Sequence, residues 1–384
     1  MGLMITWLLL LYSVVVTGWV SQKVLRLTRR YRYDGVGKST SGAKLPTVSV
    51  CIAARNETHA LAENLEYVLA SDYDKLEVLV LDDNSDDDTS LIIKSFAHAG
   101  VRFIPGRPLP VGWLGRNHAY DTLSREASGD IILFLDVDTK LAPQAISRLV
   151  DYLTVHKLEM LSVQPRREDS FRFSALFGSL RQVWELLMAS EQTPPTTSGL
   201  WMIRRDTLRH YDASLADYAM SLRPELHIAH HLQSSKAYRY IIATKELGIR
   251  FEKKWHSQAE TAERLYMPLF GETGWAVLRT LALFTGLLGP YYCLLDGLLS
   301  RHWEQAGLAF VISLLAGYMN ARIVSLTYEA SGAIVRAIIW PLLLVQDAFF
   351  YVRSLLRYRT KTVMWKGRNI LAQPRNRSHY EIDQ

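Results

Sequence analysis

The sequence predicts an α/β fold in which a mixed, mostly parallel sheet with flanking helices is held between apolar segments at the two ends of the chain. Three short apolar runs, at 47–53, 76–81 and 129–135, have the length and composition of buried strands. Amphipathic stretches at 60–69 and 89–97 separate them. Strands that alternate with helical patterns are typical of βαβ units, so the central part of the chain should form a Rossmann-like sheet covered by helices.

The distribution of apolar residues separates this central part from both ends. Hydrophobic residues make up 49% of the 384 residues and charged residues 21%, but the apolar ones are concentrated at the ends, and residues 44–263 have an ordinary globular composition. This pattern indicates a soluble domain between membrane segments. The net charge is +6, and the Lys and Arg cluster beside apolar runs, where lipid headgroups and membrane topology explain them better than nucleic acid does.

The two cysteines lie in different predicted environments. Cys51 falls in a predicted buried strand and Cys293 in a predicted membrane helix. We therefore expect neither a disulfide nor a four-ligand zinc site, and a reducing compartment.

The N-terminus carries one apolar run that is long enough to span a membrane. Residues 3–20 are almost wholly apolar, and a basic stretch follows at once, with Lys23, Arg26, Arg29, Arg30 and Arg32. A secretory signal would carry its positive charges before the apolar run, so residues 1–22 are interpreted as a retained anchor whose basic side is cytoplasmic. Residues 23–44 then form a basic linker.

Three further apolar blocks follow the central domain, at 275–299, 305–325 and 333–352, and each is long enough to cross. The tail at 357–384 is basic and should also be cytosolic. A domain and a tail on one side require an even number of crossings, so the membrane region at 267–356 contains two to four. Either the Gly289-Pro290 break makes the first block interfacial or re-entrant, or one block is split; the sequence leaves both open.

Polar clusters follow the three predicted strands at the point where each ends. The first strand is followed by Ala53-Ala-Arg-Asn-Glu57, the second by seven polar residues at 82–88, and the third by Asp136-Val-Asp138. Ligands of such sheets bind beyond the carboxyl ends of the strands, so these side chains should meet in one pocket. Residues 86–88 also suit a solvated turn that caps the next helix. The two carboxylates of Asp136 and Asp138 suit Mg²⁺ or Mn²⁺, which also bind diphosphate oxygens.

The order of these motifs, from Arg-Asn-Glu through Asp-Asp-Asn-Ser and Gly-Trp-Leu-Gly-Arg-Asn to Asp-x-Asp, resembles the inverting glycosyltransferases of family 2, which have the GT-A fold. The resemblance covers about residues 45–266, which would form a cytosolic catalytic domain. It implies that the nucleotide of a UDP-sugar donor lies against four residues, namely Ala53, Asn56, Glu57 and Asp83. It also implies that Asp138 holds the metal and that Asp136 faces the ribose or the waters of the metal.

The same resemblance assigns residues to the transfer step. Arg116 and Arg264 would contact the phosphates, the alternative being surface or membrane-facing charges. Family members carry the catalytic base in Glu-Asp-x-x-Leu-Ala, and the matching stretch here, at 224–229, begins Pro-Glu, so Glu225 takes the place of the Asp. A Pro and an acidic residue also form a good first helical turn, and Asp217 is a second candidate base.

Segments at 108–119, 264–268 and 365–368 look like the branch that acts on carotenoid, hopanoid and ceramide-type lipids, and Trp201 resembles a residue on the acceptor side. The Gln-x-x-Arg-Trp signature of polysaccharide synthases is missing. We therefore expect a membrane-bound, metal-dependent enzyme that transfers a hexose to a lipid hydroxyl at the cytoplasmic face of the bilayer. The alternatives are a processive polysaccharide synthase and a catalytically weak relative that binds nucleotide-sugar.

Overall fold

The computed structural model describes residues 2–35, 45–168, 172–210, 215–328 and 333–371. The chain divides into two compact units. An α/β unit contains Tyr33–Pro165, Ser190–Phe251 and the chain from Met364 onward, and a helical unit contains Met1–Arg32, Arg166–Ala189 and Glu252–Val363. Arg166–Ala189 thus belongs to the helical unit, although it lies inside the catalytic domain expected at 45–266. The chain from Met364 onward belongs to the α/β unit, although a separate tail is expected at 357–384.

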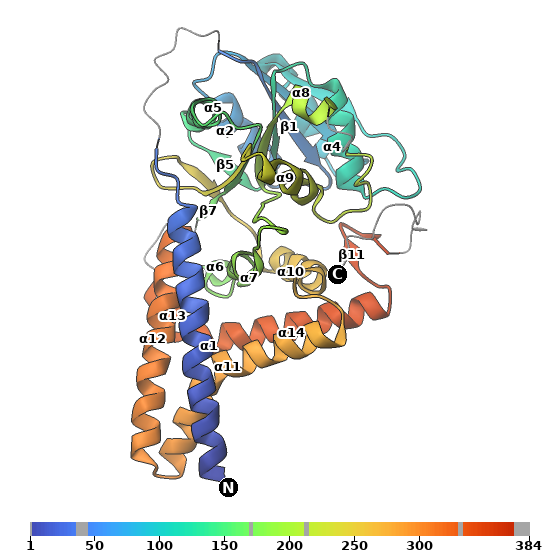
Figure 1. Cartoon of the computed structure of the whole chain (residues 1–384). Coiled ribbons are helices and arrows are strands. Elements are labelled where there is room, and N and C mark those ends of the chain that lie inside the picture. Colours follow the sequence, from blue (N-terminus) through green and yellow to red (C-terminus); the bar gives the residue numbers. More distant parts are fainter. Residues whose placement is uncertain (1, 36–44, 169–171, 211–214, 329–332, 372–384) are drawn as a thin grey trace. The chain divides into compact units, whose positions relative to one another are not determined.

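The α/β unit is built on a seven-stranded sheet with the order β3-β2-β1-β4-β8-β6-β9 (Figure 1). Its strands are β1 (Val48–Ala54), β2 (Leu76–Asp82), β3 (Val101–Pro105), β4 (Ile131–Leu135), β6 (Met160–Gln164), β8 (Leu200–Arg204) and β9 (Tyr238–Ile242). All neighbours pair in parallel except β8, which is antiparallel to both β4 and β6. The predicted mixed, mostly parallel α/β fold is confirmed.

Helices cover both faces of this sheet because successive side chains of a strand point to opposite faces. Val50 and Ile52 of β1 belong to a core shared with α2 (Leu61–Leu69) and α5 (Ala145–Val155). Cys51, between them, belongs to a second core shared with α4 (Gly115–Glu126) and α9 (Pro224–Ser234). The remaining elements of the unit are α3 (Thr89–Ser95), η1 (Ala97–Ala99), β5 (Thr139–Leu141), α8 (Arg205–His210), β10 (Ile249–Phe251), β11 (Met364–Trp365) and β12 (Arg368–Asn369).

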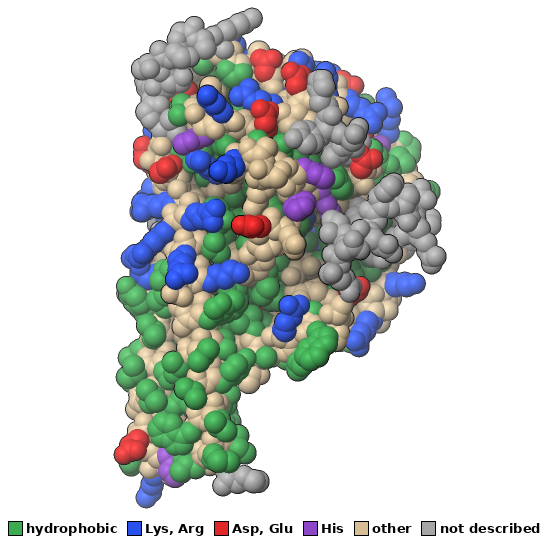
Figure 2. Space-filling view, in the orientation of Figure 1, with side chains coloured by type: hydrophobic (Ala, Val, Ile, Leu, Met, Phe, Trp, Pro, Cys, Tyr) green, Lys and Arg blue, Asp and Glu red, His purple; other side chains and the backbone are tan. Residues whose placement is uncertain are grey.

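The helical unit contains three helices that are long and apolar enough to cross a membrane, among the residues described: α1 (Gly2–Arg30), α11 (Gly274–Leu299) and α12 (Trp303–Thr327). In Figure 1, α1 and α12 run side by side, and α11 meets α1 at an angle, where Tyr12 of α1 donates a hydrogen bond to the carbonyl of Ala282 in α11. Figure 2 shows hydrophobic side chains gathered over the lower parts of α1 and α12. The other elements are β7 (Arg166–Arg167), α6 (Phe173–Leu176), α7 (Arg181–Met188), α10 (Trp255–Phe270), α13 (Ala333–Ile338) and α14 (Trp340–Arg359).

The structure bears on the two alternatives for the apolar blocks. Gly289 and Pro290 lie inside one continuous helix, α11. The block at 333–352 is instead split between α13 and α14, and Pro341 stands in the first turn of α14, where a proline can begin a helix but not continue one. Among the described helices, α14 is not one of those long and apolar enough to cross.

A buried carboxylate ties α14 to α7 and α10 within the helical unit. Asp347 is 0% exposed. Its Oδ2 accepts hydrogen bonds from Leu180 N at 2.9 Å, Trp184 Nε1 at 2.6 Å and Tyr266 Oη at 2.6 Å. One side chain thus satisfies three buried donors from two other segments.

We expect Asp347→Ala to destabilise the protein by about 3 kcal/mol or more, because each buried donor left without a partner costs about 1 to 3 kcal/mol. The thermal unfolding midpoint of the detergent-purified protein measures this. Glu272→Ala, at an exposed position of the same unit, is the matched control. Equal midpoints for the two variants would show that the three contacts do not stabilise the unit.

Candidate active site

The loops after β1 and β2 are held together by hydrogen bonds at the carboxyl edge of the sheet. Arg55 Nη1 donates to the carbonyls of Asp83 and Asn84, both at 2.6 Å. The backbone N–H of Asn56 donates to Ser85 Oγ at 3.0 Å. Asn56 and Asn84 both have φ of 52°, a left-handed conformation that asparagine adopts more readily than most residues. Ala54 at the end of β1 lies opposite Asp82 at the end of β2. The two polar loops therefore begin side by side and are joined by these hydrogen bonds.

Two carboxylates of the run at 82–88 shape this loop. Asp82 accepts from Ser85 N and Ser90 Oγ. Burial would raise the pKa of Asp87, but hydrogen bonds from Thr58 and Thr89 outweigh burial and lower the pKa of Asp87 to about 2. Asp82 and Asp87 are thus occupied by local loop contacts.

Asp83 and Glu57 are paired with cations from the end of the chain. Arg368 Nη1 lies 2.7 Å from Asp83 Oδ2, and Lys366 Nζ lies 2.7 Å from Glu57 Oε1. Burial raises the pKa of Glu57 above its ordinary value; Lys366 opposes that rise, while Asp138 adds to it. Ile52 of β1 pairs with Leu135 of β4, so Glu57 and Asp138 follow the ends of neighbouring parallel strands. Sequence reasoning noted the segment at 365–368 as a motif but assigned it no part in the site.

Asp136 follows β4 and is held by the first turn of α4. Arg116 Nη2 lies 2.7 Å from Asp136 Oδ1 and also donates to Tyr120 Oη at 2.9 Å and the carbonyl of Ser198 at 2.5 Å. Burial would lower the pKa of Arg116, but the Asp136 carboxylate outweighs burial and raises the pKa of Arg116 above its ordinary value. The guanidinium is therefore a fixed positive charge beside Asp136, and its predicted contact with phosphate stays a prediction.

The carboxylates fit a divalent ion that is shared with a diphosphate. Within the described residues, no three or more His, Cys, Asp or Glu side chains come together as a metal cluster. Mg²⁺ in phosphate-transfer sites needs only one or two carboxylates, since phosphates and waters complete its shell. Asp138, which is half-buried after β4, is the carboxylate that the resemblance assigns to the metal, and Asp136, also half-buried, lies 2.7 Å from Arg116.

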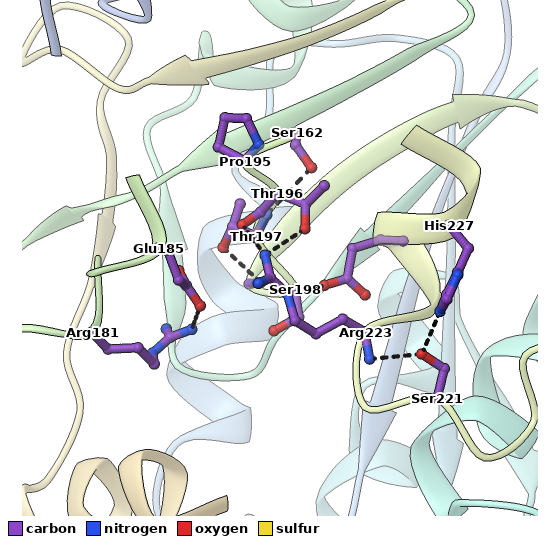
Figure 3. Close-up of polar contacts among 12 residues, drawn as sticks. Ser162, Arg181, Glu185, Pro195, Thr196, Thr197, Ser198, Ser221, Arg223 and His227 are labelled. Atoms are coloured by element: carbon purple, nitrogen blue, oxygen red, sulfur yellow. Dashed lines mark hydrogen bonds and ion pairs between the residues drawn. The ribbon is translucent and has the colours of Figure 1, made fainter. Parts of the chain in front are cut away.

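The predicted base lies at the start of α9, where Pro224 occupies the first turn. Glu225 is 1% exposed, and its Oε1 lies 3.8 Å from Arg223 Nε. Arg223 Nη2 in turn donates to Thr196 Oγ1 at 2.7 Å and to the Thr196 carbonyl at 3.1 Å (Figure 3). The charge of Glu225 also acts on Arg116. Arg223, which sequence reasoning missed, thus places a positive charge beside the carboxylate, and its only sequence signal was its position beside the Pro-Glu pair.

The neighbouring histidines of α9 are engaged with side chains of the preceding turn. His227 stacks on Tyr218 at 4.4 Å between ring centroids, and its Nε2 lies 3.1 Å from Ser221 Oγ (Figure 3). Burial lowers the pKa of His227 to about 4, so the ring is neutral at pH 7. The alternative base, Asp217, is exposed in that turn, which favours Glu225.

Three other predicted residues have different surroundings. Ala53 is half-buried in β1, opposite Leu81. Trp201 is 0% exposed and stacks on Phe134 at 4.2 Å, so its side chain belongs to the core, and its acceptor role stays a prediction without a supporting contact. Arg264 lies on α10 in the helical unit, where its carbonyl accepts from Tyr358 Oη at 2.9 Å, and its phosphate contact also stays a prediction.

Residues 49–212 match the model of Glycosyl transferase family 2. The chain is 28% identical over 154 residues to an undecaprenyl-phosphate 4-deoxy-4-formamido-L-arabinose transferase of Sodalis glossinidius, covering 37% of this chain and 45% of that protein. It is 26% identical over 153 residues to a beta-monoglucosyldiacylglycerol synthase of Synechocystis, covering 38% of this chain and 32% of that protein. A solved mannosyltransferase of Pyrobaculum calidifontis in complex with GDP-Man and Mn²⁺ aligns at 17% identity and a TM-score of 0.49 over 91% of this chain and 98% of that one.

The family match confirms the predicted resemblance for residues 49–212. The chain spans less than half the length of these two curated relatives. None of these matches tests the narrower resemblance to the carotenoid, hopanoid and ceramide branch.

Proposed function

We propose, from the family 2 match of residues 49–212, that the chain is a membrane-bound inverting glycosyltransferase that moves a sugar from a UDP-sugar to a hydroxyl of a lipid. The observation that carries the proposal is the arrangement around the first turn of α4. Gly115 lies against Asp83, and the next residue, Arg116, holds Asp136. Two consecutive residues of α4 therefore contact carboxylates that follow two different strands, β2 and β4.

In this proposal the donor lies over the carboxyl ends of β1, β2 and β4. The loop held by Arg55 presents Asn56, Glu57 and Asp83 to the nucleotide. Asp83 is only 7% exposed, so a base that donates an N–H to it replaces water with a directed, charge-assisted hydrogen bond. Asp138 would hold Mg²⁺ or Mn²⁺, which supplies positive charge for the leaving diphosphate.

The transfer step uses the buried carboxylate of Glu225. The lipid hydroxyl oxygen attacks the anomeric carbon from the face opposite the diphosphate, and its proton passes to Glu225. The bond from the anomeric carbon to the diphosphate oxygen breaks, and its electron pair leaves with UDP. Arg223 Nε, 3.8 Å from Glu225 Oε1, places a positive charge beside the carboxylate that takes this proton.

The acceptor assignment is supported by the relatives and by the apolar helices. One relative is named for undecaprenyl phosphate and another for a glucosyldiacylglycerol, both lipids. The three candidate spans would bring the chain to the bilayer in which such an acceptor resides. The basic last turn of α1, with Arg29 and Arg30, supports a cytoplasmic catalytic unit.

The surface of α14 supports two crossings, by α11 and α12, in the C-terminal region. Five of its apolar side chains are 46–58% exposed and recur at spacings of three and four residues, which places them on one face: Leu342, Val345, Phe349, Val352 and Leu356. The opposite face is buried, and Arg353 and Arg357 pair with Glu263. We propose that α14 lies in the membrane interface with its apolar stripe toward the lipid, which leaves an even number of crossings.

Spin labels on cysteines at Leu342, Phe349 and Leu356 should report the same shallow depth in lipid nanodiscs. The three positions span fourteen residues, so in a crossing helix their depths would differ by about 21 Å. Leu91→Cys, at another exposed leucine, on α3, is the control that should remain in water. A steady change in depth along the three sites would show that α14 crosses the bilayer.

The proposed function is tested by supplying the purified protein with UDP-sugars and Mn²⁺. Slow release of UDP without acceptor, and a lipid that gains the mass of one sugar in cells that make the protein, are the expected results. A polymeric product would instead support a synthase, and UDP-sugar binding without any turnover would support the inactive relative.

A further inference from the structure

The end of the described chain folds into a hairpin whose turn presents two cations. β11 and β12 pair with Trp365 opposite Arg368. The two residues between them, Lys366 and Gly367, have φ of 47° and 78°. Two consecutive left-handed residues form a type I′ turn, which suits the twist of a two-residue hairpin. A lysine in this conformation is unusual, and here its ammonium reaches Glu57.

Each cation of the hairpin pairs with a different strand end of the α/β unit. Lys366 contacts Glu57 across 309 positions of sequence, and Arg368 contacts Asp83 across 285. Side chains of all four residues are between 10% and 35% exposed. The two ion pairs are therefore partly shielded from water, and the electrostatic attraction in each is stronger than in a fully exposed ion pair.

We propose that this hairpin is a wall of the donor site and that Lys366 and Arg368 supply positive charge that a nucleoside diphosphate requires there. The inference rests on the proposed function, since the donor is the nucleotide-sugar assigned above. It adds to that function a segment more than 150 residues beyond the family match, which ends at residue 212.

The charges of the site explain why such a wall is required. Glu57, Asp83, Asp136 and Asp138 place four carboxylates along neighbouring strand ends, which are about 5 Å apart. A diphosphate brings further negative charge to the same edge. Arg116 and one divalent ion offset only part of the negative charge of these carboxylates and the diphosphate. The two cations of the hairpin offset two more negative charges.

The first turn of α4 locates the hairpin relative to the diphosphate. A Cβ added at Gly115 would lie 2.5 Å from Arg368 Nη1 and 2.6 Å from Asp83 Oδ2, so the ion pair passes directly over the glycine. The next residue, Arg116, holds Asp136. Arg368 is thus one residue of α4 away from Arg116, which holds the carboxylate expected to face the ribose or the waters of the metal.

The test compares binding of UDP and of uridine to the full chain in nanodiscs, measured by calorimetry with Mn²⁺ present. The variant is Lys366→Gln/Arg368→Gln. Because it removes charge that faces the diphosphate, UDP affinity should fall about tenfold or more, and uridine affinity should fall clearly less. The control is Lys245→Gln/Arg359→Gln, which removes the same charge from exposed positions and should bind UDP like the unaltered protein.

Unchanged UDP affinity, or equal losses for UDP and uridine, would overturn the inference while leaving the proposed function in place. An unaltered protein that binds neither ligand would overturn both. Gly115→Ala would place a methyl group against the ion pair of Asp83 and Arg368 without removing a charge. It should also weaken UDP binding, although alanine favours a helix more than glycine does. Full UDP affinity in that variant would show that the pair is not needed.

Discussion

Replacing Glu225 by Gln is expected to lower the rate of sugar transfer by about 10²- to 10⁴-fold, the usual contribution of a general base. Glutamine has nearly the same shape, but its amide cannot take the proton of the acceptor hydroxyl. The side chain is buried at the start of α9, and the nucleotide is expected over the ends of β1, β2 and β4, so UDP affinity should change little. Single-turnover transfer and calorimetric UDP binding measure the two effects separately.

Asp217→Asn is the matched control for this substitution, because it neutralises the alternative base in the exposed turn before α9. Its transfer rate should remain within about threefold of the unaltered protein, as for most exposed substitutions. A fast Glu225→Gln protein together with a slow Asp217→Asn protein would reverse the assignment. Loss of UDP binding in Glu225→Gln would indicate that the residue supports the pocket rather than the proton transfer.

The strands that carry the site could be predicted because their signal is local. The run predicted at 76–81 is β2, Leu76–Asp82, and the run at 129–135 contains β4, Ile131–Leu135. Each is a short apolar stretch ended by acidic residues, so strand and strand end are visible together. The antiparallel insertion of β8 between β4 and β6 is not visible in this way, because it depends on pairing between distant segments.

The parts of the site that could not be predicted depend on distant partners. Asp83 stands at the end of a predicted strand, whereas its ion pair with Arg368 joins residues 285 positions apart. The left-handed turn that orients Lys366 is a local feature, but the sequence around Lys366 does not predict Glu57 as its partner. Trp201 shows a different limit, since the motif resemblance suggests an acceptor-side residue, whereas the burial of the indole against Phe134 depends on pairing between β4 and β8.

The membrane region shows the same limit. An apolar run of about twenty residues predicts a span by length. The five exposed side chains of α14 recur along one face, yet the same helix also contains Asp347, Arg353 and Arg357, which face other helices of the unit. Only the partners of these charged residues distinguish an interfacial helix from a crossing one.

Asp138→Asn is expected to remove the stimulation of UDP binding by Mn²⁺ and to lower transfer by about 10²- to 10³-fold, the size of effect seen when charge stabilisation of a leaving group is lost. The reason is that the resemblance assigns the metal to Asp138, while the half-buried carboxylate of Asp136 lies 2.7 Å from Arg116. UDP titrations with Mn²⁺ and with EDTA measure the effect. Asp74→Asn, which neutralises an exposed carboxylate of the same unit, should keep the full difference between the two titrations. If Asp138→Asn keeps that difference and Asp136→Asn loses it, the metal is held by Asp136, and Arg116 must then release that carboxylate when the donor binds.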